Sequence, residues 1–213
     1  RAARLGIPMA LAIIGGDPAR FAPYANLYHE ALEKFGQKTL PISIHSPGHI
    51  AATDAEAKDV LWPHYEKFID RLGRERGWGP ASRSHFEQEI AHGSLYVGSP
   101  DTVAKKIAYA IQAVGASRFD LKYANGPVPH EHLMKSIELY ATEVVPRVRR
   151  ILAEDLRQQG RSVTAFDIKL LGEAGQELLQ SSQRIEPTFL VKDGFTFEHT
   201  TPEAALRWAI STR

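Results

Sequence analysis

The sequence has no cysteine among its 213 residues, and this absence excludes disulfide bonds, thiolate catalysis and cysteine-ligated zinc sites. It also has almost no excess charge, with 26 Lys and Arg against 25 Asp and Glu, so nothing in its composition favours nucleic acid or an anionic membrane. No apolar run approaches the about 20 residues that a membrane-spanning helix needs, and we find no signal-peptide pattern. We therefore expect a cytoplasmic protein without nucleic-acid or membrane partners.

The composition is otherwise typical of a globular protein, with 43% hydrophobic and 24% charged residues. A continuous apolar run at residues 9–14 is typical of a strand buried on both faces, as in a parallel sheet. The run ends at Gly15 and Gly16, after which Asp17 is a suitable N-cap and Pro18 a suitable first helical residue. These signals predict a strand, a glycine turn and a helix.

A second strand is predicted at residues 40–51, where side chains of two kinds alternate. Ile42 and Ile44 lie on one face of this strand, and Ser43 and His45 lie on the other. In a closed barrel the polar pair would point inward while the isoleucines meet the surrounding helices.

The following segments repeat the alternation of strands and helices. A brief extended piece at residues 94–97 leads to Ser99, a good N-cap for a helix that begins at Pro100, and a third strand at residues 118–126 precedes a helix that starts at His130. The turn around Ser99 has two interpretations, a helix cap or an anion site. The order of elements implies an α/β fold whose parallel strands are joined by right-handed crossovers.

Four segments, in this order along the chain, resemble the C-terminal half of the luciferase-like, flavin-dependent monooxygenases. They are residues 1–32, 41–65, 95–107 and 118–149, which include the stretches LAIIGGDPARFAPYANLYHEAL, PISIHSPGHIAATDAEA, LYVGSPDTVAKKI and RFDLKYANGPVPHEHLMKSIELYATEVVPRVR. The resemblance covers about residues 1–152.

The resemblance implies the C-terminal part of a TIM (β/α)8 barrel, with three parallel strands and their helices in residues 1–153. It also implies that the first five strands of the barrel are missing. Three parallel strands cannot close a barrel, so both sheet edges would be unpaired, and we expect a homo- or hetero-oligomer or a partner chain. Residues 154–213 form an unassigned α+β tail, either an extension or a second module, with a predicted hairpin turn at residues 192–194.

For function, the resemblance implies a flavin-dependent oxidoreductase that uses reduced FMN, with the deazaflavin F420 as the alternative. The reaction would be monooxygenation of a small-molecule substrate by O2 through a peroxyflavin, with a flavin reductase as a possible partner. The alternative hypothesis is a non-catalytic half-barrel that carries flavin or binds another protein. The absence of part of the barrel favours this second hypothesis, whereas the residues retained at the strand ends favour the enzyme.

The catalytic candidate is His45, placed near the end of the second strand, where a neutral imidazole can donate a hydrogen bond or transfer a proton. Its alternative role is structural, with the ring satisfied by a backbone carbonyl. Gly15 and Gly16 are cofactor-binding candidates, because a turn without side chains forms a flat wall for a flavin ring. The alternative is a tight turn that needs glycine for its dihedral angles.

Ser46, Lys122 and Asn125 complete the cofactor-binding candidates at the strand ends. Asp120 and Lys122 share one strand face, and a buried lone charge is costly, so we expect them to pair with each other or with charges on neighbouring strands. Lys122 would then either contact a flavin oxygen or belong to an ion pair inside the barrel. No histidine spacing matches a metal-binding motif such as HExxH, so we predict no metal site.

Overall fold

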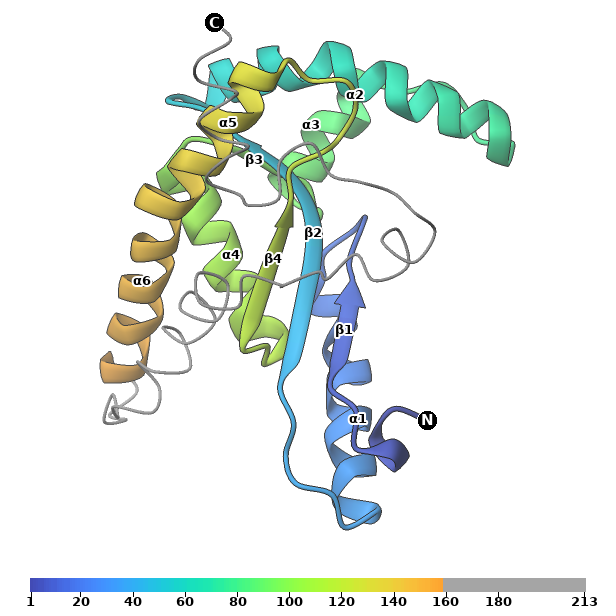
Figure 1. Ribbon diagram of the computed structural model, residues 1–213, viewed down its shortest axis with the longest axis vertical. Coiled ribbons are helices and arrows are strands. Elements are labelled where there is room, and N and C mark those ends of the chain that lie inside the picture. Colours follow the sequence, from blue (N-terminus) through green and yellow to red (C-terminus); the bar gives the residue numbers. More distant parts are fainter. Residues whose placement is uncertain (159–213) are drawn as a thin grey trace, which may run out of the picture. The chain divides into compact units, whose positions relative to one another are not determined.

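The computed structural model describes residues 1–158 (Figure 1). Its elements are η1 (Ala3–Leu5), β1 (Met9–Ala12), η2 (Pro18–Phe21), α1 (Ala22–Lys34), β2 (Ile42–Ile50), α2 (Asp54–Arg76), α3 (Arg83–Ala91), β3 (Tyr96–Gly98), α4 (Pro100–Val114), β4 (Arg118–Lys122), α5 (His130–Leu139), the π-helix η3 (Tyr140–Val144) and α6 (Val145–Gln158). None of the helices within residues 1–158 combines the length and apolar character needed to cross a bilayer. The predicted hairpin and most of the predicted tail lie outside the described residues.

The sheet is built around β2, which pairs in parallel with every other strand. β1 lies along residues 42–45 on one edge of β2, and β4 lies along residues 43–47 on the other edge. β3 pairs with residues 48–50, beyond the part of β2 that pairs with β1. The predicted α/β fold with parallel strands is confirmed, but the described residues form four strands and not three, because the extended piece before Ser99 joins the sheet as β3.

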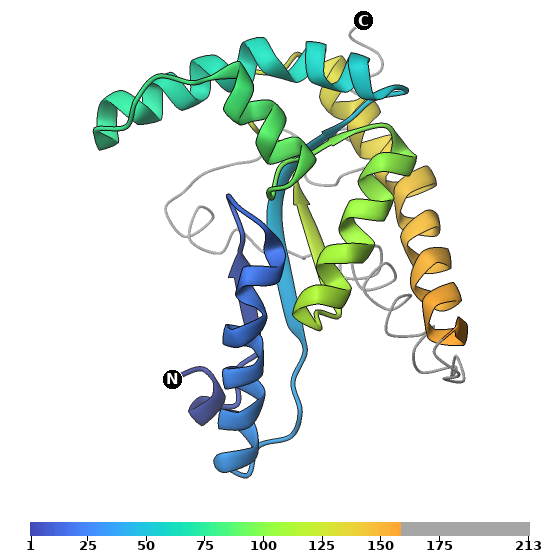
Figure 2. The same cartoon turned by 180° about the vertical axis from the view of Figure 1, so that it is seen from behind.

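Helices cover one face of this sheet. Figures 1 and 2 show α1 and α4 lying against the same side of the strands. Ile42 and Ile44 point into this layer and are fully buried, as the alternation predicted. The main core also contains buried residues from α1, α4 and α6, namely Ala25, Tyr28, Leu32, Val103, Ile107, Val114, Val148 and Leu152. Burial of these apolar side chains is what holds the helices onto the strands.

The opposite face of the sheet is open over much of its length in the described structure. Ala10, Ala12, His45 and Arg118 are exposed there. Among residues 1–158, no strand pairs with the outer edges of β1 and β4. At the carboxyl ends of the strands, α2 and α3 form a second core, whose buried residues include Ala57, Leu61, Phe86, Leu95, Val97 and Val128. The described chain is therefore a partial barrel with one closed end and open edges.

Gly48 provides a direct test of the packing around β2. A Cβ atom at this position would lie 2.5 Å from Leu121 Cδ1 and closer still to the Tyr96 carbonyl oxygen. Gly48→Ala is therefore expected to lower the free energy of unfolding by about 1–3 kcal/mol, because β3 or β4 must shift to make room. Urea unfolding measures this change.

The matched control is Gly79→Ala, because no atom lies within 4 Å of a Cβ built there. An equal urea midpoint for the two variants would show that the close approach around Gly48 is wrong.

Candidate functional site

The carboxyl ends of the strands gather most of the predicted site residues at one edge of the sheet. In register, His45 of β2 lies between Ala12 of β1 and Asp120 of β4, and Lys122 of β4 lies opposite Pro47. Directly opposed residues of parallel strands point to the same face. His45, Asp120 and Lys122 therefore share the open face, and Lys122 ends β4 on the side where barrels of this architecture carry their active sites. The predicted place of His45 near the end of its strand is wrong, because β2 continues to Ile50, and His45 is level only with the end of β1.

His45 is exposed on this face, and its backbone holds the end of β1. Its carbonyl oxygen accepts a hydrogen bond from the Ile13 N–H at 3.0 Å, which continues the β1–β2 ladder to the start of the glycine turn. An exposed imidazole on a rigid strand can exchange protons with a bound molecule. The catalytic role of His45 stays a prediction.

Asp120 and Lys122 do not pair with each other. Asp120 Oδ1 accepts hydrogen bonds from Arg118 Nε and Nη2, each at 2.8 Å. The Lys122 ammonium lies 5.4 Å from the centre of the Phe68 ring of α2. The expected partners are therefore wrong, because Arg118 lies two residues before Asp120 on the same strand face and its long side chain reaches the carboxylate. Lys122 instead makes a cation–π contact with Phe68. Its side chain lies on the open face, at the end of β4.

Ser46 and Asn125 are buried and make structural hydrogen bonds. The Ser46 hydroxyl donates to the Ile13 carbonyl at 2.8 Å, from the face of β2 opposite to His45. The Asn125 amide nitrogen donates to the carbonyls of Gly48 at 2.9 Å and Lys122 at 2.8 Å. The structure therefore places Asn125 beyond the carboxyl end of β4, whereas the side chains of Ser46 and His45 point to opposite faces of β2. Cofactor binding by either residue stays a prediction.

The glycine turn after β1 contacts a residue that the sequence analysis did not single out. Gly16 has a φ of 74°, a left-handed conformation that favours glycine. Its N–H points to Glu89 of α3, with distances of 3.2 and 3.1 Å to the two carboxylate oxygens. Glu89 lies 73 residues further along the chain, and no local pattern marks it as a partner of this turn. Gly15 is exposed beside this contact.

At the turn before α4, a backbone N–H is likewise bonded to a carboxylate of this chain. Ser99 caps the helix through its hydroxyl, as predicted, which accepts from the Thr102 N–H. The Ser99 N–H donates to Asp54 Oδ1 at 2.6 Å, and the Thr102 hydroxyl donates to Asp54 Oδ2 at 3.0 Å. These hydrogen bonds, led by the one from the Ser99 backbone, lower the pKa of Asp54. At these two turns, backbone N–H groups of the kind that bind anions are thus bonded to carboxylates of this chain.

These contacts define how the described residues fit a flavin. A flat ring that carries polar oxygens could approach the exposed Gly15 and the open sheet face beside His45 and Lys122. The N–H groups of Gly16 and Ser99 are already bonded to carboxylates, so they do not provide a site for the flavin phosphate. These residues would therefore fit one side of a flavin ring, and other groups would be needed to hold its phosphate.

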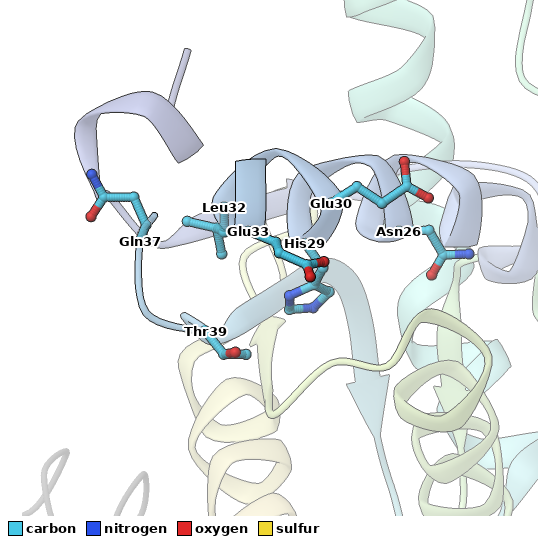
Figure 3. A pocket seen from close by; sticks show the side chains of 7 residues that line it. All are labelled: Asn26, His29, Glu30, Leu32, Glu33, Gln37 and Thr39. Atoms are coloured by element: carbon cyan, nitrogen blue, oxygen red, sulfur yellow. The ribbon is translucent and has the colours of Figure 1, made fainter. Parts of the chain in front are cut away.

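A pocket also lies at the other end of the strands (Figure 3). It is lined by Asn26, His29, Glu30, Leu32, Glu33, Gln37 and Thr39. These residues belong to α1 and to the loop that enters the amino end of β2, whereas His45 lies level with the last residue of β1. In barrels of this type the amino end serves stability and the carboxyl end carries the chemistry, so we assign this pocket no catalytic role.

Three histidines from different elements lie close together beyond His45. His49 of β2 is buried, and the Nδ1 atoms of His49 and of His64 of α2 have no hydrogen-bond partner in the described structure. The pKa of His49 is lowered to about 4, chiefly by burial; the charges of His132 of α5 and of His64 act in the same direction, and the charge of Glu56 acts against them. Within residues 1–158, no three side chains are arranged to hold a metal ion.

This depressed pKa predicts a specific loss of stability in acid. The unfolded chain binds a proton at His49 near pH 6.5, whereas the folded chain does so near pH 4. Stability is therefore lost as the pH falls from 6.5 to 4, by at most about 3 kcal/mol for this group. His49→Phe, which cannot titrate, is expected to show a smaller fall in the free energy of unfolding over this range, measured by urea denaturation.

The exposed His85 of α3 provides the control for this measurement, and His85→Gln should keep the acid sensitivity of the original chain. If His49→Phe loses stability in acid as steeply as His85→Gln, the buried neutral state of His49 is wrong.

Two solved structures share the fold of the described residues. One is the monooxygenase RslO1 from Streptomyces bottropensis, with a TM-score of 0.56 and 22% identity over 68% of this chain and 43% of that chain. The other is the oxygenating constituent of the 3,6-diketocamphane monooxygenase from the CAM plasmid of Pseudomonas putida, in complex with FMN, with a TM-score of 0.54 and 19% identity over 69% and 44%. The chain thus spans less than half the length of either protein.

A family model described as a domain of unknown function (DUF1731) matches residues 164–209, which lie outside the described part of the chain. No curated protein sequence matches this chain. At identities near 20% the two solved structures establish the fold and not the reaction. The described residues form part of a TIM-barrel-like α/β fold, as the sequence predicted.

Proposed function

We propose that this chain is part of a luciferase-like, flavin-dependent monooxygenase. The observation that carries the proposal is the open sheet face shared by His45 and Lys122, with His45 opposite the last residue of β1 and the exposed Gly15 three residues after that strand. The same fold occurs in two monooxygenases, one of them solved with FMN. Fold alone does not determine chemistry, so the proposal depends on the residues at this edge.

The proposed cofactor is FMN, with F420 as the alternative. When bound in its reduced form, FMN would supply the electrons with which O2 transfers one oxygen atom to a small-molecule substrate. Gly15 would let the ring approach the backbone, and the Lys122 ammonium would donate a hydrogen bond to a ring oxygen. His45 would hold or move a proton at its exposed imidazole, beside Asp120, whose charge is already balanced by Arg118.

The proposed partners are inferred from the unpaired outer sides of β1 and β4. The outer edges of β1 and β4 lack partner strands within residues 1–158, and exposed strand edges promote association. We propose that further strands, from the same polypeptide, a second copy or another chain, complete the barrel. A separate flavin reductase would supply the reduced cofactor.

A second candidate is a non-catalytic half-barrel that carries flavin or binds another protein. Its protein-binding form is favoured by the two turns at which Glu89 and Asp54 occupy backbone N–H groups, since these turns then offer nothing to a cofactor phosphate. In this case residues 154–213, proposed as a second module, would determine the partner.

A titration of the full chain with oxidised and then reduced FMN, followed by flavin fluorescence, tests the proposal. We expect saturable one-to-one binding, and about tenfold weaker binding for Lys122→Met, because one charge-assisted hydrogen bond is lost. The control is Lys135→Met, because Lys135 lies on the exposed side of α5 and pairs with Glu138 at 3.0 Å.

The outcomes separate the two candidates. Binding combined with oxygen uptake that falls in His45→Ala supports the monooxygenase, whereas binding without oxygen uptake supports the flavin-carrying half-barrel. If neither FMN nor F420 binds, the flavin proposal is wrong for this chain.

A further inference from the structure

The Glu89 carboxylate contacts both the glycine turn and Ser94, which itself contacts this turn. Besides the Gly16 N–H, its carboxylate accepts a hydrogen bond from the Ser94 N–H at 3.1 Å. The Ser94 hydroxyl in turn donates to the Gly16 carbonyl. Gly93 leaves the space for this carboxylate, because a Cβ atom there would overlap it. The N–H of Gly16 is therefore bonded to α3, and its carbonyl to the segment between α3 and β3.

The end of α3 that carries Glu89 is itself held by a half-buried lysine. Lys106 of α4 donates to the carbonyls of Glu89 and Leu95, each at 2.9 Å, and to the carbonyl of Ile90. Its ammonium also lies 5.2 Å from the centre of the Tyr96 ring. Burial lowers the pKa of Lys106 to about 8, with an opposing effect of the Glu89 charge. A cation at the carbonyl end of a helix is favourable, so Lys106 fixes the position from which Glu89 reaches the turn.

The turn needs such support because little else restrains its first residues. Ile14 is 72% exposed and Gly15 is also exposed. On the far side, Asp17 caps η2 by accepting from the Ala19 N–H at 2.9 Å. Gly16 is the residue at which the left-handed backbone is required, and the bonds from Glu89 and Ser94 act on this residue.

We propose that Glu89 is a positioning residue, which holds the Gly15–Gly16 turn in the conformation that a flavin ring would meet. This inference rests on the proposed function, because the turn matters to the reaction only if a flavin lies against it. Glu89 acts through the Gly16 backbone and does not touch the cofactor. Its charge also keeps a second anion away from the Gly16 N–H, so the ring and not the phosphate of the flavin would occupy this side.

The test compares Glu89→Ala and Glu89→Gln in the full chain. We expect Glu89→Ala to speed hydrogen exchange at the Gly16 amide about tenfold and to weaken FMN binding about tenfold, with a changed visible absorption spectrum of the bound flavin. Glu89→Gln keeps one acceptor oxygen, so its FMN affinity should lie within about threefold of the original. The control is Glu87→Gln on the same helix, where Glu87 pairs with Lys58 at 2.6 Å and Arg83 at 2.7 Å.

The outcomes distinguish this inference from the proposed function. If the original chain binds FMN and Glu89→Ala binds it equally well with the same spectrum, Glu89 is not a positioning residue. If the original chain binds no flavin, the proposed function fails, and with it any role of the turn in a flavin site. If Glu89→Ala does not fold, Glu89→Asp decides, because its carboxylate is one methylene shorter and no longer reaches the Gly16 N–H; a Gly16 exchange rate and a flavin spectrum equal to those of Glu87→Gln would then overturn the inference.

Discussion

The pairing of β2 with three other strands is the constraint on which the rest of the structure depends. Because β1 and β4 occupy its two edges and β3 joins only at its last three residues, β2 determines which side chains meet at the carboxyl end. A shift of one residue in this register would exchange the two faces. His45 would then lie in the core and Ile44 in the open face, and the proposed site would not exist.

Carboxylates from distant segments complete the carboxyl end of the sheet. Backbone N–H groups at the starts of helices and in glycine turns attract negative charge, and an unbonded one is costly when buried. Here Glu89 and Asp54 satisfy two such turns from within the chain. The same bonds connect α3 to the end of β1 and α2 to the start of α4. The electrostatic attraction that could bind a ligand is used instead to join the elements around the site.

The sequence predicts the features that depend on neighbouring residues. The capping of η2 by Asp17 and of α4 by Ser99 and the faces of Ile44 and His45 follow from local patterns, and the structure confirms them. A strand forms at the apolar run as predicted, but its expected burial on both faces is wrong, because the described residues leave one face of β1 open at Ala10 and Ala12. Features that depend on distant residues were missed, because a single sequence carries no record of which carboxylate reaches which turn. The ion pair between Arg118 and Asp120 was not predicted for another reason. It depends on how far the arginine side chain reaches along its own strand, and strand alternation carries no information about that.

The proposed site would be able to carry out its chemistry only if further strands close the barrel. Monooxygenation requires that water be kept from the reacting flavin, and an imidazole or ammonium group acts more strongly where water is excluded. In the described residues, His45 and Arg118 are exposed on the open face, and the edges of β1 and β4 are unpaired. Strands that pair with these edges would also cover this face. In the proposed enzyme, the partner that removes the unpaired edges would therefore also be the one that keeps water from the site.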